Sequence, residues 1–267
     1  MKEKLKKVVV ITGASSGIGL KTATYLYDQG YIVYGLSRRL VEDIGIRNIS
    51  CDITKKEDVV AAFKQIIELE GQIDYVVNNA GMGISGAIEY TSEQEMRQIQ
   101  EVNVWGLISV CQVALPYLRT SKGMIVNIGS VAGELTIPFQ SFYSMTKASV
   151  GVLTEALRME CRPFQVRVVC VLPGDTKTDF TKNRVQPKIQ QDEIYQDRII
   201  RSIQKMEKDE KNGVNPLKVS KTIARMMKRK HPPVKVVVGW DYKILVFLKR
   251  FLPNRLINWI LYQMYGK

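Results

Sequence analysis

A tyrosine and a lysine lie four residues apart in this sequence, as Tyr143 and Lys147 of the segment SFYSMTK. On a helix this spacing places both side chains on one face, about one turn apart. A phenol with an ordinary pKa of about 10 exchanges protons poorly at neutral pH, but a neighbouring ammonium group favours the phenolate and lowers that pKa. The pair therefore predicts acid–base chemistry with Tyr143 as the proton-transferring residue, although the same spacing also occurs in ordinary surface pairs.

A serine close to this segment supports the prediction. Ser130 lies thirteen residues before Tyr143, just after a β-branched run that ends at Ile128. The carboxyl ends of parallel strands face the crevice where ligands bind, and a hydroxyl group there can stabilise negative charge on a substrate oxygen. We expect Ser130 to orient a carbonyl or alcohol oxygen beside the phenol.

Three glycines follow the first apolar run of the chain, Val8–Thr12. Gly13, Gly17 and Gly19 form a G-x-x-x-G-x-G pattern that leads into a helical stretch. Glycines let the backbone approach a pyrophosphate closely, and the free amides of a helix N-terminus attract its charge. A glycine-rich turn alone is weak support for such a site, but a turn between a buried strand and a helix is much stronger.

The segment Thr12–Gly19 resembles the cofactor-binding motif of the short-chain dehydrogenase/reductase family. The resemblance implies a single Rossmann-type α/β domain with a doubly wound parallel sheet, and hydride transfer between a nicotinamide and an alcohol or carbonyl group. Beyond residue 180 the match is loose, and the overall pattern is most similar to hydroxysteroid and retinol dehydrogenases. Within about residues 7–180 the resemblance also covers Asn78–Gly81, Asn103, Ser130, Tyr143 with Lys147, and Pro173 with Gly174.

The resemblance also implies roles for individual residues. Lys147 contacts the nicotinamide ribose, and Asn103 holds a water molecule that links the lysine to solvent. The implied catalytic set is Asn103, Ser130, Tyr143 and Lys147. The implied cofactor-binding set is Gly13, Ser15, Ser16, Gly17, Ile18, Gly19, Arg38, Arg39, Asp52, Ile53, Asn79, Ala80, Gly81, Tyr143, Lys147, Pro173, Gly174, Thr176 and Thr178.

The choice of cofactor depends on the end of the second strand-like run. Many NAD-binding sheets carry an acidic residue there, which accepts hydrogen bonds from the adenosine ribose. This chain has Arg38 and Arg39 instead, and a guanidinium group can pair with a 2′-phosphate through two donors. NADP(H) is therefore preferred, and NAD(H) remains possible if Glu42 or Asp43 reaches the ribose. By resemblance, Arg38 is the phosphate ligand and Ser15 assists it.

Asp52 has two interpretations. By resemblance its carboxylate accepts a hydrogen bond from the adenine amino group, with Ile53 beside the ring. Alternatively, Asp52 caps a helix that begins near Lys55.

Short β-branched runs alternate with longer helical stretches, which is typical of a parallel sheet with crossover helices. Residues 179–215 are polar and charge-rich, which indicates a helical insertion that acts as a substrate lid or as a passive pair of surface helices. Helices are expected near residues 17–30, 55–70, 92–119, 143–161 and 216–230. Seven runs predict one seven-stranded sheet: Val8–Thr12, Ile32–Leu36, Ile49–Asp52, Tyr75–Asn78, Ile125–Ile128, Val166–Leu172 and Val234–Val238.

The last segment, residues 242–267, is apolar and basic. Charges and Pro253 interrupt it, so no stretch reaches the roughly 18 uncharged apolar residues that a membrane span needs. Two interpretations remain: an apolar flap or subunit contact packed on the fold, which we favour, and an interfacial helix in peripheral contact with a membrane. The family resemblance implies a homodimer or homotetramer.

The composition also indicates which partners, metal sites and cellular location to expect. The 267 residues carry a formal net charge of +13, which favours an anionic partner or reflects a solvated basic surface. Four scattered cysteines and the single histidine, His231, offer no metal-ligand spacing, so no metal site is expected. The basic cluster Lys228–Lys230 has no accompanying nucleic-acid-binding motif, so no nucleic acid is expected. The first apolar run is too short for a signal peptide, which indicates a cytoplasmic protein.

The substrate side is expected to include Met82, Glu134 and Phe139 together with Ser130 and Tyr143. The surrounding segments are apolar, which suits an apolar secondary alcohol or ketone of the hydroxysteroid or retinoid kind. A 3-oxoacyl-carrier-protein reductase is the alternative enzyme, because an acidic carrier would suit the basic surface. A binding protein that senses the dinucleotide without chemistry is the alternative of another class, although it would have no use for the complete catalytic set.

Overall fold

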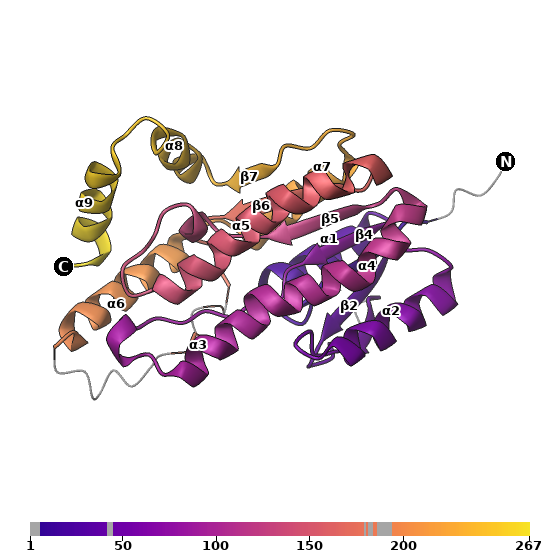
Figure 1. The fold of residues 1–267 in the computed structure, drawn as a ribbon, viewed down its shortest axis with the longest axis horizontal. Helices are drawn as coiled ribbons and strands as arrows, with labels where there is room; N and C mark the ends of the chain where they lie inside the picture. Colours follow the sequence, from indigo (N-terminus) through magenta and orange to yellow (C-terminus); the bar gives the residue numbers. More distant parts are fainter. Residues whose placement is uncertain (1–5, 42–44, 179, 181–183, 186–193) are drawn as a thin grey trace.

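The computed structural model describes the chain except for residues 1–5, 42–44, 179, 181–183 and 186–193. Within these residues, a seven-stranded sheet has the order β3-β2-β1-β4-β5-β6-β7, and all neighbouring strands are parallel (Figure 1). The doubly wound, seven-stranded parallel sheet predicted from the sequence is confirmed. Its strands are β1 Val8–Thr12, β2 Ile32–Ser37, β3 Arg47–Ser50, β4 Tyr75–Asn78, β5 Met124–Ile128, β6 Arg167–Pro173 and β7 Lys235–Val238.

Helices cover both faces of the sheet (Figure 1). The α-helices are α1 Gly17–Asp28, α2 Lys56–Glu70, α3 Glu93–Gln100, α4 Leu107–Ser121, α5 Ser141–Cys161, α6 Gln196–Asn212, α7 Pro216–Lys228, α8 Trp240–Leu248 and α9 Asn254–Tyr265. One face packs on α2, α4 and α5 through strand residues such as Val10 and Ile125, and the other packs on α1 and α7 through residues such as Val9 and Val126. Because successive side chains of a strand point to opposite faces, the central strands contribute to both cores.

Most elements begin and end within two residues of their predicted bounds, and two of the differences have a clear physical reason. The third strand is Arg47–Ser50 rather than Ile49–Asp52, because pairing with β2 at the edge of the sheet, rather than apolar content, sets its ends. The helix expected over residues 92–119 is divided into α3 and α4 by a π-helical stretch, Glu101–Gly106. Hydrophobic periodicity does not distinguish such a stretch from continuous α-helix.

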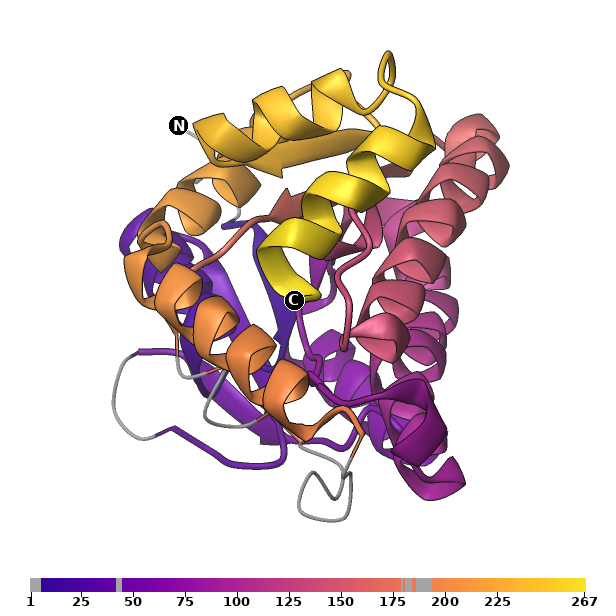
Figure 2. The same cartoon turned by 90° about the vertical axis from the view of Figure 1, so that its left-hand side faces the viewer.

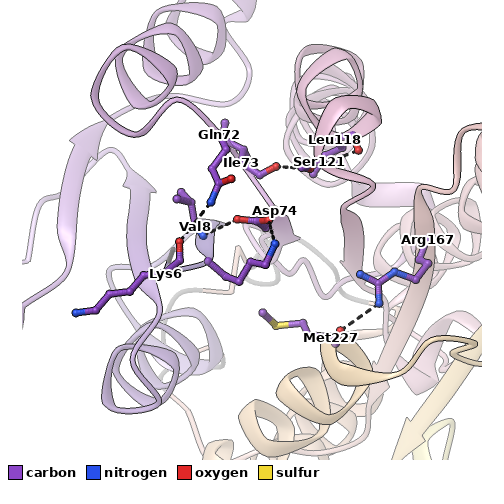
Figure 3. A network of polar contacts seen from close by, with 10 residues as sticks. Lys6, Val8, Gln72, Ile73, Asp74, Leu118, Ser121, Arg167 and Met227 are labelled. Carbon is purple, nitrogen blue, oxygen red and sulfur yellow. Dashed lines mark hydrogen bonds and ion pairs between the residues drawn. The ribbon is translucent and has the colours of Figure 1, made fainter. Parts of the chain in front are cut away.

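The amino ends of the strands are held together by polar contacts (Figure 3). The Asp74 carboxylate is almost fully buried and accepts hydrogen bonds from the Val8 amide at 2.9 Å and from Lys7 Nζ at 2.7 Å. Arg167 donates to the Met227 carbonyl at 3.2 Å and so ties β6 to α7. These groups stabilise the sheet, and the ligand crevice of such sheets lies at the opposite, carboxyl end of the strands.

Helices α6, α8 and α9 lie around the carboxyl end of the sheet (Figure 2). Ile199, Ile203 and Met206 of α6 form a third apolar cluster with Ala87 and with Tyr265 of α9. The predicted insertion is thus helical over much of its described part, and the C-terminal segment packs on the fold through one of its faces. Among the described residues, no helix combines the length and the apolar character needed to traverse a bilayer.

Candidate active site

A deep cleft opens at the carboxyl ends of the strands. Its volume is about 1260 Å³, and its lining runs from the β1–α1 turn past the ends of β2, β4, β5 and β6 to α6 and the C-terminal helices. Every residue of the expected cofactor-binding set lines this cleft except Gly19, which is buried within the turn. Ligands of doubly wound sheets bind at this edge, so the topology and the motif indicate the same place.

The turn between β1 and α1 is shaped for close approach of a ligand. Gly13 and Gly17 have φ angles of 64° and 54°, in the left-handed region that favours glycine. A Cβ atom at Gly19 would lie only 2.2 Å from the Gly13 carbonyl oxygen. Larger residues at these positions would therefore displace the backbone from its present course.

The turn after β4 holds the glycine turn in place. Thr12 Oγ1 accepts hydrogen bonds from the Asn79 and Ala80 amides, each at 3.0 Å. The Asn79 side chain donates to the carbonyls of Thr12 and Gly13 at 3.0 and 3.1 Å. The first turn of α1 has no side-chain cap among the described residues, so its amides can donate to a phosphate. The geometry of the turn and its free donors both fit a dinucleotide pyrophosphate.

Arg38 and Arg39 line the cleft directly after β2, and both are exposed. A guanidinium at this place can reach a phosphate without the cost of burying its charge. Glu42 and Asp43, which the sequence left open as ribose ligands, lie outside the described residues. The described end of β2 therefore presents cations to the cleft.

Asp52 and Ile53 also line the cleft. Asp52 Oδ1 accepts hydrogen bonds from the Thr54 amide and hydroxyl at 3.0 and 2.8 Å. Burial opposes ionisation of Asp52, but these two bonds and the charge of Arg38 outweigh it and lower the pKa of the carboxyl group. Helix α2 begins with Lys55 as its N-cap, so Asp52 stabilises the turn before the helix rather than capping the helix itself.

Ser130, Tyr143 and Lys147 come together in the same cleft. The Lys147 Nζ atom donates to the Ile128 carbonyl at 2.9 Å and lies 5.8 Å from the centre of the Tyr143 ring. Burial lowers the pKa of this ammonium group to about 8. The ring of Phe180 packs against the phenol, with ring centres 5.6 Å apart.

The acidity of Tyr143 differs from the expectation. Burial raises the pKa of the phenol to about 12, against the opposing effects of a hydrogen bond with Ser130 and the charge of Arg184. Lys147 is directed instead to the Ile128 carbonyl. A phenol with this pKa is protonated at neutral pH and is a weaker acid than an exposed tyrosine.

Asn103 lies in the π-helical stretch between α3 and α4 and is buried. Its Oδ1 accepts a hydrogen bond from the Met82 amide at 2.8 Å, and its Nδ2 donates to the Met82 carbonyl at 2.9 Å and to Thr146 Oγ1 at 3.0 Å. The side chain therefore ties the loop after β4 to α5, the helix that carries Tyr143 and Lys147. Such π-helical stretches are frequent at functional sites.

The substrate side differs in part from the expectation. Met82 lines the cleft, but Glu134 and Phe139 do not. The Glu134 carboxylate forms an ion pair with Lys235 at 2.8 Å, and the Phe139 ring packs against Tyr195 with ring centres 6.3 Å apart. Their loop contributes two other apolar residues to the cleft, Leu135 and Ile137.

A charged pair lies at the Tyr143 end of the cleft, and sequence reasoning missed it. Arg184 and Glu210 form an ion pair with side chains 1% and 13% exposed, and both charges act on the Tyr143 phenol. Among the described residues, Nε and Nη1 of Arg184 and Oε2 of Glu210 are buried without a hydrogen-bond partner. Such atoms can serve a polar ligand group. No spacing rule connects the two residues, so the sequence carries no signal for them.

The C-terminal helices form the apolar wall of the cleft. Helix α8 rests on the turn after β6, where a Cβ atom at Gly174 would lie 2.1 Å from the Tyr242 ring. The sequence indicated an apolar flap, but not which of its residues face inward. The apolar residues of this segment that line the cleft are Leu245, Leu248, Leu252, Ile257, Ile260, Leu261 and Met264.

Comparison with known proteins identifies similar chains. A family model described as short chain dehydrogenase matches residues 7–189. A 3-ketodihydrosphingosine reductase of Bacteroides thetaiotaomicron is 41% identical over 259 residues, which cover 96% of each chain. An NADPH-dependent 1-acyldihydroxyacetone phosphate reductase of Saccharomyces cerevisiae is 31% identical over 268 residues, which cover 95% of this chain and 89% of the relative. The crystal structure of a short-chain dehydrogenase from Streptomyces avermitilis matches with a TM-score of 0.83 and 29% identity over 93% of each chain.

Proposed function

The chain belongs to the short-chain dehydrogenase family, and on this premise we propose that it is an NADPH-dependent reductase of long-chain amphiphilic ketones. As a member of the family it is an oxidoreductase that acts on CH–OH or keto groups and uses a nicotinamide dinucleotide. One observation carries the substrate proposal: the cleft that contains Ser130 and Tyr143 continues without interruption along the apolar wall formed by α8 and α9.

The residues of the cleft suit a carbonyl reduction. NADPH bound along the glycine turn would supply the hydride to the carbonyl carbon. Tyr143 donates its proton to the carbonyl oxygen, and the Ser130 hydroxyl stabilises the developing negative charge by a hydrogen bond. Lys147, whose Nζ lies 5.8 Å from the centre of the Tyr143 ring, would stabilise the phenolate left after the proton is donated. The Tyr143 phenol is protonated at neutral pH, as donation of a proton to a carbonyl requires.

The apolar wall supports a substrate with a long chain. Burial of each methylene group contributes about 0.8 kcal/mol, so a wall of seven apolar side chains favours an extended alkyl group over a small ketone. The two relatives described above are named for lipid ketones, and neither is named for a steroid or a retinoid. The proposed substrate class therefore moves from the hydroxysteroid or retinoid expected from the sequence to long-chain ketones.

The Arg184–Glu210 pair supports a polar head group next to the reacting carbonyl. Both residues line the cleft, both charges act on the Tyr143 phenol, and the pair has donor and acceptor atoms without a hydrogen-bond partner among the described residues. Burial raises the pKa of Glu210, and a cationic amine beside it would lower that pKa and favour the carboxylate. A ketone that carries an amino group and a hydroxyl group on the neighbouring carbons, as 3-ketodihydrosphingosine does, offers partners for both residues.

NADPH is proposed over NADH because Arg38 and Arg39 stand where a carboxylate would otherwise bind the ribose. The yeast relative is named as NADPH-dependent, which agrees with this choice.

The proposal is tested by following NADPH oxidation with a panel of ketones. We expect the highest kcat/KM with 3-ketodihydrosphingosine, a lower value with its N-acetyl derivative, and values at least about 100-fold lower with a ketosteroid, retinal or acetoacetyl thioester. Glu210→Gln is the matched variant, because it should reduce kcat/KM for the free amine and leave that for the N-acetyl derivative nearly unchanged. Equal or faster reduction of the steroid or the thioester would contradict the long-chain assignment.

We also propose a homodimer or homotetramer, with the outer face of α5 as a contact. Met145, Val152 and Met159 repeat every seven residues on that helix and are 45%, 66% and 70% exposed. An apolar stripe of this kind favours packing against a second copy. Light scattering of the purified protein measures the subunit number, and a monomer at micromolar concentration would contradict the assignment.

A further inference from the structure

The C-terminal helices have a second apolar face that points away from the fold. In α8 and the turn after it, Trp240, Ile244, Phe247 and Phe251 recur at the spacing of one helical face. Trp240 and Phe251 are 72% and 70% exposed. We call this surface the outer apolar face; it consists of Trp240, Ile244, Phe247, Phe251, Leu256 and Trp259, all of them exposed.

This face adjoins the mouth of the cleft. Leu245, Leu248 and Met264 line the cleft, yet each is at least 40% exposed. The same two helices therefore present apolar side chains to the cleft interior, to its opening and to the surrounding solvent. Figure 2 shows them, in gold and yellow, at the end of the molecule that faces the viewer. Monomeric proteins rarely leave such a surface without a partner.

The charges around the face favour an anionic partner. The segment from Trp240 to Lys267 contains five lysine and arginine residues and one acidic residue, Asp241. Lys243 lies with its Nζ 6.0 Å from the centre of the Trp240 ring, and Arg250 and Arg255 are exposed. Tryptophan and cationic side chains around an apolar surface are characteristic of proteins that lie in the interface of a bilayer.

The same charges oppose a second copy of the chain as the partner. A twofold contact through this face would place the same patch of both subunits together, so each set of cations would meet its own copy. Like charges brought together across an interface are unfavourable, whereas anionic lipid head groups neutralise them.

We infer that the outer apolar face docks on an anionic lipid bilayer, with the mouth of the cleft against the membrane. The helices then lie in the interface and do not cross it. A long-chain substrate would enter the cleft from the lipid phase without passing through water. The docking can be tested independently of the proposed substrate, because the test measures binding to lipid vesicles and not turnover.

Binding to vesicles tests the inference with the full chain. We expect the protein to sediment with phosphatidylglycerol vesicles, to bind phosphatidylcholine vesicles more weakly, and to dissociate from the anionic vesicles as salt is raised. In a Trp105→Phe background, where Trp240 and Trp259 are the remaining tryptophans, the emission should shift to the blue and be quenched by lipids brominated in their chains. No binding to anionic vesicles at low salt, or no quenching by brominated lipid, would overturn the inference.

A matched pair of variants separates docking from general hydrophobicity. Phe247→Ser combined with Phe251→Ser should weaken vesicle binding by at least about tenfold, because the variant no longer buries these two apolar side chains in the bilayer. Val60→Ser combined with Leu69→Ser on α2 removes two other exposed apolar side chains and should bind as the wild type does. Both double variants should retain the turnover of a short, water-soluble ketone, which shows that they are folded. Equal vesicle binding by the two double variants would overturn the docking. The docking would also be overturned if the only effect of the two phenylalanine changes were loss of a dimer in sedimentation equilibrium.

Discussion

At the cofactor end of the cleft the backbone sets the geometry, whereas at the substrate end the side chains of α6, α8 and α9 do. The glycine turn is fixed by two positive φ angles and by the hydrogen bonds that join Thr12 to Asn79. The apolar wall, in contrast, is built from single side chains that project from two helices. One substitution can therefore abolish cofactor binding or chemistry at the first end, while the second end should respond in small steps that depend on the substrate.

The largest effect is expected from Tyr143→Phe, which removes the proton donor and retains the ring. We expect kcat to fall by about 10²–10⁴-fold, the usual contribution of a general acid. The Kd for NADPH, measured by fluorescence titration, should change by less than about twofold, because the phosphate-binding turn is untouched. Turnover close to that of the wild type would remove Tyr143 from its proposed role.

A smaller effect is expected from Arg38→Ala at the adenosine edge. Loss of a charge-assisted hydrogen bond to phosphate costs about 1.5–3 kcal/mol, so kcat/KM for NADPH should fall by about 10–150-fold while that for NADH stays nearly constant. Steady-state kinetics with both cofactors measure the ratio. Arg39→Ala serves as the neighbouring control with a smaller loss. A parallel loss with NADH would show that the residue supports the fold rather than the 2′-phosphate.

The smallest effect is expected from Leu261→Ala in the apolar wall. The lost side chain lies inside the cleft, so KM for a long-chain ketone should rise by about three- to tenfold, with little change for a short ketone. Asn258→Ala, at an exposed position on the same helix that neither lines the cleft nor belongs to the outer apolar face, is the control and should leave both values unchanged. A loss of turnover that is the same for both chain lengths would contradict the contrast between the two ends.

The parts of the site that could be predicted from the sequence are those that follow from local patterns. The glycine turn comes directly after a buried run, and Ser130 comes just after another, so the rule for parallel sheets places them at one edge. Tyr143 and Lys147 share a helix, and their spacing alone brings them onto one face. In each case a few consecutive residues contain enough information to place the side chain.

The parts that could not be predicted depend on how irregular segments run. The loop after β5 directs Glu134 toward Lys235 and Phe139 toward Tyr195, and no periodicity indicates these directions. The raised pKa of Tyr143 likewise arises from burial, which is a property of the assembled cleft and not of its helix. Packing between distant segments decides both outcomes.

The docking of Tyr265 against α6 has a practical consequence for handling the protein. The Tyr265 hydroxyl donates to Asp209 at 3.0 Å, and Arg198 donates twice to the Gly266 carbonyl, at 2.9 and 2.6 Å. A purification tag fused after Lys267 would emerge from the rim of the substrate entrance, where it can compete with these contacts. A tag placed ahead of β1 joins the chain at the amino ends of the strands, away from the cleft at their carboxyl ends, and leaves the entrance undisturbed.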